Sequence, residues 1–227
     1  MTQLRVVTYN VHKCKGMDGR TSAKRIAEVL REVNADVIAL QEALAHQAEA
    51  ISQELEIPFV LGENRKHRGY AYGNVVLSRL PIRETHNYDL SVRGREERGC
   101  LRADVEVNGA GVVHVFNVHL GTALLERREQ GRKLIAPELL THADYQAPRI
   151  VMGDFNEWTS GLATRLLRSH LQAAEVSRSY PGLLPLLKLD HIYYDPQLRL
   201  HQLCVHRTKK ALVASDHLPL IGDFAWQ

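Results

Sequence analysis

Cysteine, long apolar runs and an excess charge of one sign are all scarce in this chain of 227 residues. The three cysteines, Cys14, Cys100 and Cys204, are an odd number at wide spacing without a Cys-x-x-Cys pair, which argues against a disulfide framework and a zinc site. No apolar run approaches the roughly 20 residues that a transmembrane helix needs. Met1 leads into a strand-like segment and not into a secretory signal. We therefore expect a cytoplasmic protein without a transmembrane segment.

The charge balance is close to neutral, with 29 Lys and Arg against 26 Asp and Glu, a net charge of +3. A protein dedicated to coating DNA has a much stronger basic bias. The local run Arg65-Lys66-His67-Arg68 is favoured as solvated surface, because charge alone is weak evidence of a site. A second basic cluster, from Arg93 to Arg102, runs into an expected strand and can direct an arginine towards a site.

Apolar periodicity predicts an α/β protein with one domain over residues 1–227. A first helix is expected between a cap at Thr21 or Ser22 and a stop at Asn34. Its apolar face comprises Ile26, Val29, Leu30 and Val33. Further helices are expected at 46–55, 124–140 and 162–171. Strands are expected at 4–9, 36–40, 74–78, 82–88, 101–107, 112–118, 149–152, 190–194, 199–206 and 218–224. The pattern favours two packed mixed sheets with helices outside.

A leucine-rich loop, Gly182–Leu187, comes shortly before Asp190. Such a loop could touch lipid if it lay beside a site. We favour the alternative that its leucines belong to the core, because apolar loop residues usually pack inward.

Polar side chains stand at the ends of the expected strands, which is the arrangement of an active site on the rim of a sheet. These residues are Asn10, Glu42, His119, Asp154, Asp216 and His217. A carboxylate such as Glu42 suits Mg²⁺ or Mn²⁺, although Glu42 could instead cap the next helix. Asp154 and Asn156 would face one way in an extended chain and suit a phosphoryl centre with its water, although an Asx turn explains the pair equally well.

A histidine that acts as a base needs an acidic partner. Adjacent strand residues point apart, so Asp190 on another strand is a better partner for His217 than Asp216. His217 could also be structural, since the chain has 12 histidines. His119, expected one residue beyond its strand, could stabilise a phosphoryl oxygen or protonate a leaving group.

With these segments in hand, the chain resembles the endonuclease/exonuclease/phosphatase superfamily over almost its whole length. Each motif is weak alone, but they occur in the family's order. The matching segments are Thr8-Tyr9-Asn10, Leu40-Gln41-Glu42, Gly73-Asn74, Leu77-Ser78-Arg79-Leu80-Pro81, Arg98-Gly99, Asn117-Val118-His119-Leu120, Gly153-Asp154-Phe155-Asn156, Leu189-Asp190-His191-Ile192 and Ser215-Asp216-His217-Leu218-Pro219.

The resemblance implies a four-layer α/β sandwich of the DNase I type that hydrolyses phosphate esters. It implies a divalent metal, Mg²⁺ or Mn²⁺, held by Glu42 with Asn10 and Asp216 nearby. It also implies a base, His217, oriented by Asp190. Further residues would position the water or bind phosphate and substrate, and these are Asp154, Asn156, His119, Arg98, Asn74 and His12. Family accounts differ on whether the residue matching Asp154 or the one matching His217 activates water.

Two departures bear on the branch of the family. The abasic-site endonucleases usually carry Asn-x-Asp where this chain has Asn10-Val11-His12, and Tyr-x-Pro-Asn where it has Asn117-Val118-His119-Leu120. The second segment is more similar to the sphingomyelinase-like and phosphatase-like branches. We therefore expect a monomeric phosphodiesterase or phosphatase for a small or lipid-derived ester, with transient membrane contact as an option. The alternatives are a nuclease and a non-catalytic phosphate-binding module.

Overall fold

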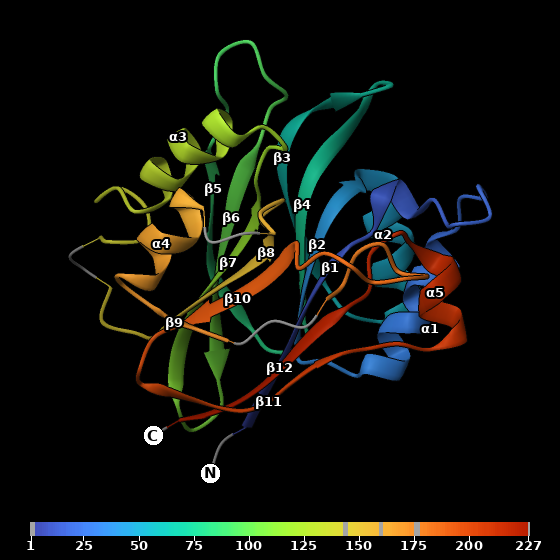
Figure 1. Cartoon of the computed structure of the whole chain (residues 1–227). Coiled ribbons are helices and arrows are strands. Elements are labelled where there is room, and N and C mark those ends of the chain that lie inside the picture. The colour runs from blue at the N-terminus through green and yellow to red at the C-terminus, as the bar shows by residue number, and fades with distance from the viewer. Residues whose placement is uncertain (1–2, 143–144, 159–160, 175–177, 227) are drawn as a thin grey trace.

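The structure is a computed structural model that describes residues 3–142, 145–158, 161–174 and 178–226. Two six-stranded sheets pack face to face, and helices cover their outer faces (Figure 1). Helices α1 (Ala23–Val33), α2 (Ala45–Leu55) and α5 (Lys209–Ala214) lie on one side, and α3 (Leu124–Leu134) and α4 (Leu162–Arg168) on the other. The predicted four-layer α/β sandwich is confirmed.

Each sheet is built around one parallel pair of strands. The first sheet has the order β11 (Leu198–Val205), β12 (Leu220–Trp226), β1 (Gln3–Asn10), β2 (Val37–Leu44), β4 (Tyr70–Ser78) and β3 (Phe59–His67). The second has the order β5 (Ile82–Asp89), β6 (Gly99–Val107), β7 (Gly111–His119), β8 (Arg149–Asp154), β10 (Asp190–Tyr194) and β9 (Gln172–Ala173). Strands β1 and β2 are parallel, as are β7 and β8, whereas the other described pairs are antiparallel.

Apolar strand residues from both sheets form the central core. Val6 and Val37 of the first sheet pack in one cluster with Val105, Ile150 and Ile192 of the second, all fully buried. Burying a side chain of this size contributes roughly 1.5–3 kcal/mol, so the facing strand surfaces hold the two sheets together.

Helix α1 follows the sequence prediction closely. The Ser22 hydroxyl accepts a hydrogen bond from the backbone N–H of Arg25 at 3.3 Å and so caps its first turn. Asn34 ends the helix in the left-handed conformation, with φ of 50°. The four residues of its predicted apolar face are buried.

Other boundaries differ from the prediction. Helix α3 ends at Leu134 and not near residue 140, because Pro137 disfavours helical geometry at the residue before it and breaks the backbone hydrogen-bond ladder. Helix α4 ends at Arg168 and not at the predicted Leu171. Helix α5 was not predicted, and the Thr208 hydroxyl caps it by accepting from the Ala211 N–H at 3.3 Å.

Two general features complete the fold. Cys14, Cys100 and Cys204 carry free thiols. Across the described residues, the helices are too short or too polar for any of them to cross a membrane.

Candidate functional site

The carboxyl ends of both parallel pairs meet at one rim of the sandwich. Asn10 ends β1, and its amide nitrogen donates to Asp154 Oδ2 at 2.9 Å and to Glu42 Oε1 at 3.4 Å. Asp154 ends β8, so these contacts join the two sheets. His119 ends β7 opposite Asp154, and its Nε2 lies 3.9 Å from Asp154 Oδ2 and 4.0 Å from Glu42 Oε1. The structure therefore brings four of the predicted residues together.

The sequence predicted Glu42 after its strand, but the residue lies inside β2, where the backbone is irregular. Pairing with β4 shifts register between Leu40 and Ala43, and Glu42 has a φ of 57°. A residue other than glycine pays roughly 1–2 kcal/mol in this left-handed region, and such bulges often re-aim a side chain at a site. The N-cap of α2 is Leu44, so Glu42 does not cap that helix.

Glu42 and Asp216 carry their negative charge beside basic partners. Lys13 Nζ lies 2.6 Å from Glu42 Oε2, and His12 Nδ1 lies 3.0 Å from Asp216 Oδ2. Burial alone would raise the pKa of Glu42, but His119, Lys13 and the Asn10 amide together hold it well below its usual range. Burial also opposes the ionised form of Asp216, yet its hydrogen bond to His12 lowers its pKa.

His217 is paired with Asp190, as the sequence argument predicted. Its Nδ1 lies 2.9 Å from Asp190 Oδ2, which also accepts a hydrogen bond from the Ser179 hydroxyl. Strand β10 runs antiparallel to β8 and sets Asp190 opposite Asp154, and for this reason the amino end of β10 reaches the same rim. The other imidazole nitrogen, Nε2, lies 3.6 Å from Asp154 Oδ2. The Tyr180 ring packs against the imidazole, 4.8 Å between ring centroids.

The surroundings of the two buried histidines of the site shift their pKa values in opposite directions. Burial lowers the pKa of His217, but Asp190 and Asp154 outweigh that effect and raise it to about 10. Burial, helped by the positive charge of Arg98, lowers the pKa of His119 to about 4. At neutral pH, His217 is therefore the charged imidazolium and His119 the neutral imidazole.

Arg98 presents unused hydrogen-bond donors beside the site. The residue is only 6% exposed, and its Nη2 pairs with Glu96 Oε2 at 2.7 Å. Its Nε and Nη1 atoms are buried without a hydrogen-bond partner in the described part of the chain. Leaving a buried donor unpaired costs roughly 1–3 kcal/mol, and more for a charged group. The arrangement suits an anion that arrives from outside.

Asn156 is not placed as an extended chain would place it. Its φ is 49°, and its backbone N–H donates to Asp154 Oδ1 at 2.9 Å. This is the Asx turn, the alternative to the extended arrangement. Its side-chain amide donates to the carbonyl of Leu120 at 2.9 Å. In this conformation Asn156 fastens the loop after β8 to the end of β7.

Asn74 needs a correction, because it is fully buried and its amide donates to the carbonyls of Gly99 at 2.9 Å and Asn117 at 3.0 Å. Its amide nitrogen therefore ties the sheets together and is not available to a substrate. Gln41 and Asn117 belong to the same network, with Gln41 Nε2 donating to Asn117 Oδ1 at 2.7 Å. In the sequence both lie in segments that match the family, but nothing there shows that the two side chains pair.

The leucine loop is also corrected, since Leu183, Leu184 and Leu186 are 64%, 65% and 56% exposed. The loop lies beside the site, because the Gly182 N–H donates to the Asp216 carbonyl at 2.6 Å. A short backbone bridge between Tyr180 and Leu187 turns the loop back on itself, and its leucines point away from the core.

Part of the donor set at the rim suits a divalent cation. Within the described residues, no group of three or more His, Cys, Asp or Glu side chains is arranged to hold a metal by itself. Mg²⁺ commonly uses only one or two carboxylates and completes its shell with water and phosphate oxygens. Glu42 and Asp216 fit that chemistry, and the Lys13 ammonium already lies beside the Glu42 carboxylate as a positive charge. Asn10 fits less well, because its amide oxygen accepts from the His12 N–H at 3.0 Å.

Comparison with known proteins finds relatives that span almost the whole chain. Residues 7–217 match the model of the Endonuclease/Exonuclease/phosphatase family. The uncharacterized protein YbhP of Escherichia coli (strain K12) is 32% identical over 247 aligned residues, covering 96% of this chain and 95% of YbhP. The crystal structure of an endonuclease/exonuclease/phosphatase from Beutenbergia cavernae DSM 12333 has a TM-score of 0.82 and 25% identity, covering 100% of this chain and 72% of that chain.

Two more distant structures share the fold, each with 17% identity and a TM-score of 0.78. One is the mannosyl-6-phosphatase Bt3783 of Bacteroides thetaiotaomicron VPI-5482, with 98% of this chain and 100% of that chain covered. The other is D. rerio TDP2 complexed with a single strand DNA product, with 99% and 100% covered. The fold is thus the DNase I-like sandwich.

Proposed function

Because the chain belongs to the Endonuclease/Exonuclease/phosphatase family, we propose that it is a divalent-metal-dependent phosphoesterase that hydrolyses a phosphodiester of a small or lipid-derived alcohol. The observation that carries the proposal is the Asp190–His217 pair, whose free imidazole nitrogen lies 3.6 Å from Asp154. An oriented imidazole beside a second carboxylate is suited to moving a proton between water and an ester.

Glu42 would hold the cation, Mg²⁺ or Mn²⁺, with Asn10 hydrogen-bonded to its carboxylate and with Asp216 near enough for the two carboxylates to interact. When bound, the cation supplies positive charge that stabilises the phosphoryl and leaving oxygens. Arg98 would add its buried, unpaired guanidinium nitrogens to the phosphoryl oxygens. His119, held neutral by burial, can donate one hydrogen bond to a phosphoryl or leaving oxygen.

His217 is our candidate for the base. Asp190 keeps a proton on Nδ1, so that Nε2 faces the site beside Asp154. The resting imidazole is protonated because the surrounding carboxylates raise its pKa. A cation held beside Asp216 would oppose that effect and favour the neutral base. The water oxygen then attacks phosphorus while its proton passes to Nε2, and the bond from phosphorus to the leaving oxygen breaks.

Asp154 is the candidate for positioning that water, since its carboxylate faces both His217 and His119. Asn156 contributes indirectly, because its backbone N–H fixes the Asp154 carboxylate. The leaving alcohol takes up a proton from the imidazolium or from solvent, which returns the site to its starting state.

A small or lipid-derived substrate is favoured over abasic DNA by two features. One is the pair of motif departures at His12 and His119. The other is the loop with Leu183, Leu184 and Leu186, which exposes apolar side chains and is hydrogen-bonded to the Asp216 carbonyl, next to His217 in the chain. Exposed apolar groups at the mouth of a site suit an amphiphile at a lipid surface.

A nuclease is the second candidate, and the DNA product bound to D. rerio TDP2 on the same fold favours it. A panel of substrates with Mg²⁺ separates the two: an aryl phosphodiester, an aryl phosphomonoester, a short-chain phospholipid, plasmid DNA and an abasic duplex. EDTA and a His217→Ala variant are the controls. We expect the small diester and the phospholipid to be hydrolysed fastest. Preference for the abasic duplex would overturn the choice of branch, and activity that survives His217→Ala would overturn the assigned site.

A further inference from the structure

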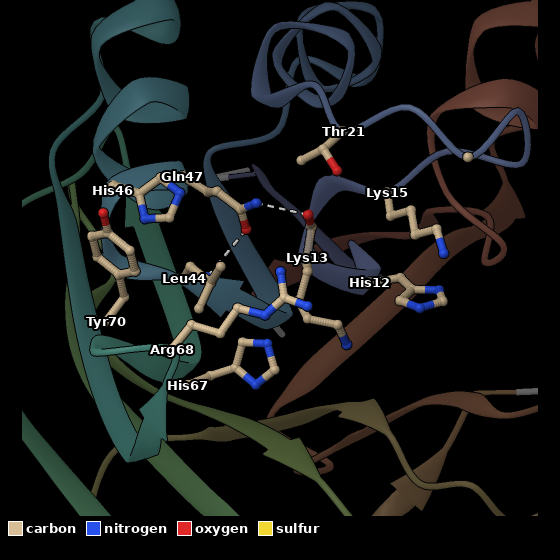
Figure 2. A pocket seen from close by; sticks show the side chains of 11 residues that line it. His12, Lys13, Lys15, Thr21, Leu44, His46, Gln47, His67, Arg68 and Tyr70 are labelled. Carbon is tan, nitrogen blue, oxygen red and sulfur yellow. Dashed lines mark hydrogen bonds between the residues drawn. The ribbon is translucent and has the colours of Figure 1, made fainter.

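A basic cavity of about 580 Å³ opens beside the site (Figure 2). Its described lining contains no Asp or Glu. Its basic residues are His12, Lys13, Lys15, His46, His67 and Arg68. Figure 2 shows Lys13, Lys15 and His12 on one side and Arg68 reaching from the other side towards Lys13. No carboxylate in the described part of the chain forms an ion pair with Lys15 or Arg68, so their charge is available to a ligand.

Two residues of the cavity lining contact the candidate active site. His12 lines the cavity while its Nδ1 lies 3.0 Å from Asp216. Lys13 also lines it, and its Nζ lies 2.6 Å from Glu42. A molecule with its scissile phosphate at Glu42 can therefore extend past Lys13 into the cavity.

The backbone that carries the basic residues is held in costly conformations. His12, Lys13 and Cys14 have φ values of 44°, 55° and 54°, so three consecutive residues are left-handed without a glycine. Arg68 has a φ of 50° in the two-residue turn between β3 and β4, where asparagine, aspartate or glycine is usual. Each such residue costs roughly 1–2 kcal/mol, and strain of this kind gathers at ligand sites.

Neighbouring side chains hold this lining in place. The Gln47 amide donates to the Lys13 carbonyl at 2.7 Å and accepts from the Leu44 N–H at 3.3 Å (Figure 2). His46 packs against Tyr70 with ring centroids 4.5 Å apart and closes one wall. The left-handed turn is therefore fixed to α2 and does not depend on a ligand for its shape.

We propose that this cavity binds a second phosphate group of the substrate, so that the protein prefers phosphodiesters that carry an additional phosphate. This rests on the proposed function, since the scissile phosphate must lie at Glu42. A dianionic phosphate suits unpaired lysine and arginine donors, whereas a neutral headgroup would leave them without a partner. The same chemistry could come from a phosphorylated headgroup or from the next phosphate of a nucleic acid strand.

The test compares two chromogenic diesters, ethyl p-nitrophenyl phosphate and its 2-phosphoethyl counterpart. We expect the second to have a kcat/KM higher by roughly tenfold or more, mainly through KM, because a charge-assisted hydrogen bond contributes on that scale. Lys15→Gln and Arg68→Gln should each remove about tenfold of this preference. Lys66→Gln is the matched control: it removes one charge from the same hairpin, and Lys66 is not among the described cavity residues. Equal kcat/KM values for the two esters, or equal effects of all three variants, would overturn the inference.

Binding measured by calorimetry separates this inference from the proposed function. Propanediol bisphosphate should bind about tenfold more tightly than propanediol monophosphate, and Lys15→Gln should abolish the difference. If that preference is present but neither ester is hydrolysed, the cavity stands and the phosphoesterase proposal fails. A short single-stranded oligonucleotide forms a further arm. Cleavage of it that depends on Lys15 and Arg68 and exceeds cleavage of the phosphoethyl ester would identify a neighbouring nucleic acid phosphate as the ligand.

Discussion

Replacing Asp190 with asparagine removes the charge that governs His217 while keeping an oxygen near its Nδ1. Asp190 Oδ2 lies 2.9 Å from that nitrogen, and the carboxylate is fully buried, so its charge is poorly screened. Among the causes that raise the pKa of His217, the charge of Asp190 is the largest. Asp190→Asn should therefore lower that pKa and let the imidazole take the wrong tautomer.

General acid–base catalysis contributes about 10²- to 10⁴-fold, so we expect kcat of Asp190→Asn to fall by that factor. This corresponds to about 3–5 kcal/mol in activation free energy. The assay is the initial rate of bis-p-nitrophenyl phosphate hydrolysis with Mg²⁺, together with an NMR titration of the His217 imidazole.

Two control variants separate this effect from a loss of folding. Ser179→Ala removes a neutral donor from Asp190 but keeps the charge of the carboxylate, and should cost about tenfold or less. Asp195→Asn breaks a partly buried pair with Arg149, 2.7 Å away, and should affect stability more than kcat. A loss below tenfold in Asp190→Asn, with an unchanged His217 titration, would refute the reasoning.

Three further outcomes are expected. Arg98→Gln should raise KM by roughly tenfold or more, because it removes charged donors that would bind the phosphate. The control Arg83→Gln changes an exposed arginine and should leave steady-state kinetics unchanged, so equal KM values for the two variants would count against Arg98. Gly153→Ala should cost about 3 kcal/mol or more in urea unfolding, since a Cβ would stand 1.8 Å from the Val118 carbonyl oxygen, and a variant of native stability would contradict the packing. His217 has a pKa of about 10 in the folded protein, above its ordinary 6.5, so its stabilising effect is complete below pH 6.5 and is lost as pH rises through 10. The difference in free energy of unfolding between wild type and His217→Gln should therefore shrink over that range, and a constant difference would argue against the raised pKa.

The parts of the fold that depend on local pattern were predictable. Helix α1 has its apolar face, its Ser22 cap and its Asn34 stop in the sequence itself. The positions of Asn10, Asp154 and Asp190 followed from the rule that parallel strands deliver residues at their carboxyl ends and antiparallel strands at their amino ends. That rule needs only the strands and their directions.

The parts that depend on tertiary contacts were not predictable. Asn74 sits in an apolar strand among motif residues, and only the packed sheets show that backbone carbonyls occupy its amide. The left-handed turn at His12–Cys14 has no glycine to announce it, so the basic cavity beside it was not foreseen. Leu183 and Leu184 carry the pattern of core residues, yet their loop folds over the rim and leaves them exposed.

The most direct test of the central claim is the hydrolysis of bis-p-nitrophenyl phosphate in Mg²⁺ by wild type, Glu42→Gln and His217→Ala. The account predicts turnover by wild type that EDTA abolishes, a loss of at least about 10²-fold in each variant, and partial recovery of Glu42→Gln at high Mg²⁺. Turnover that persists in EDTA, or that either variant retains at the wild-type level, would contradict it.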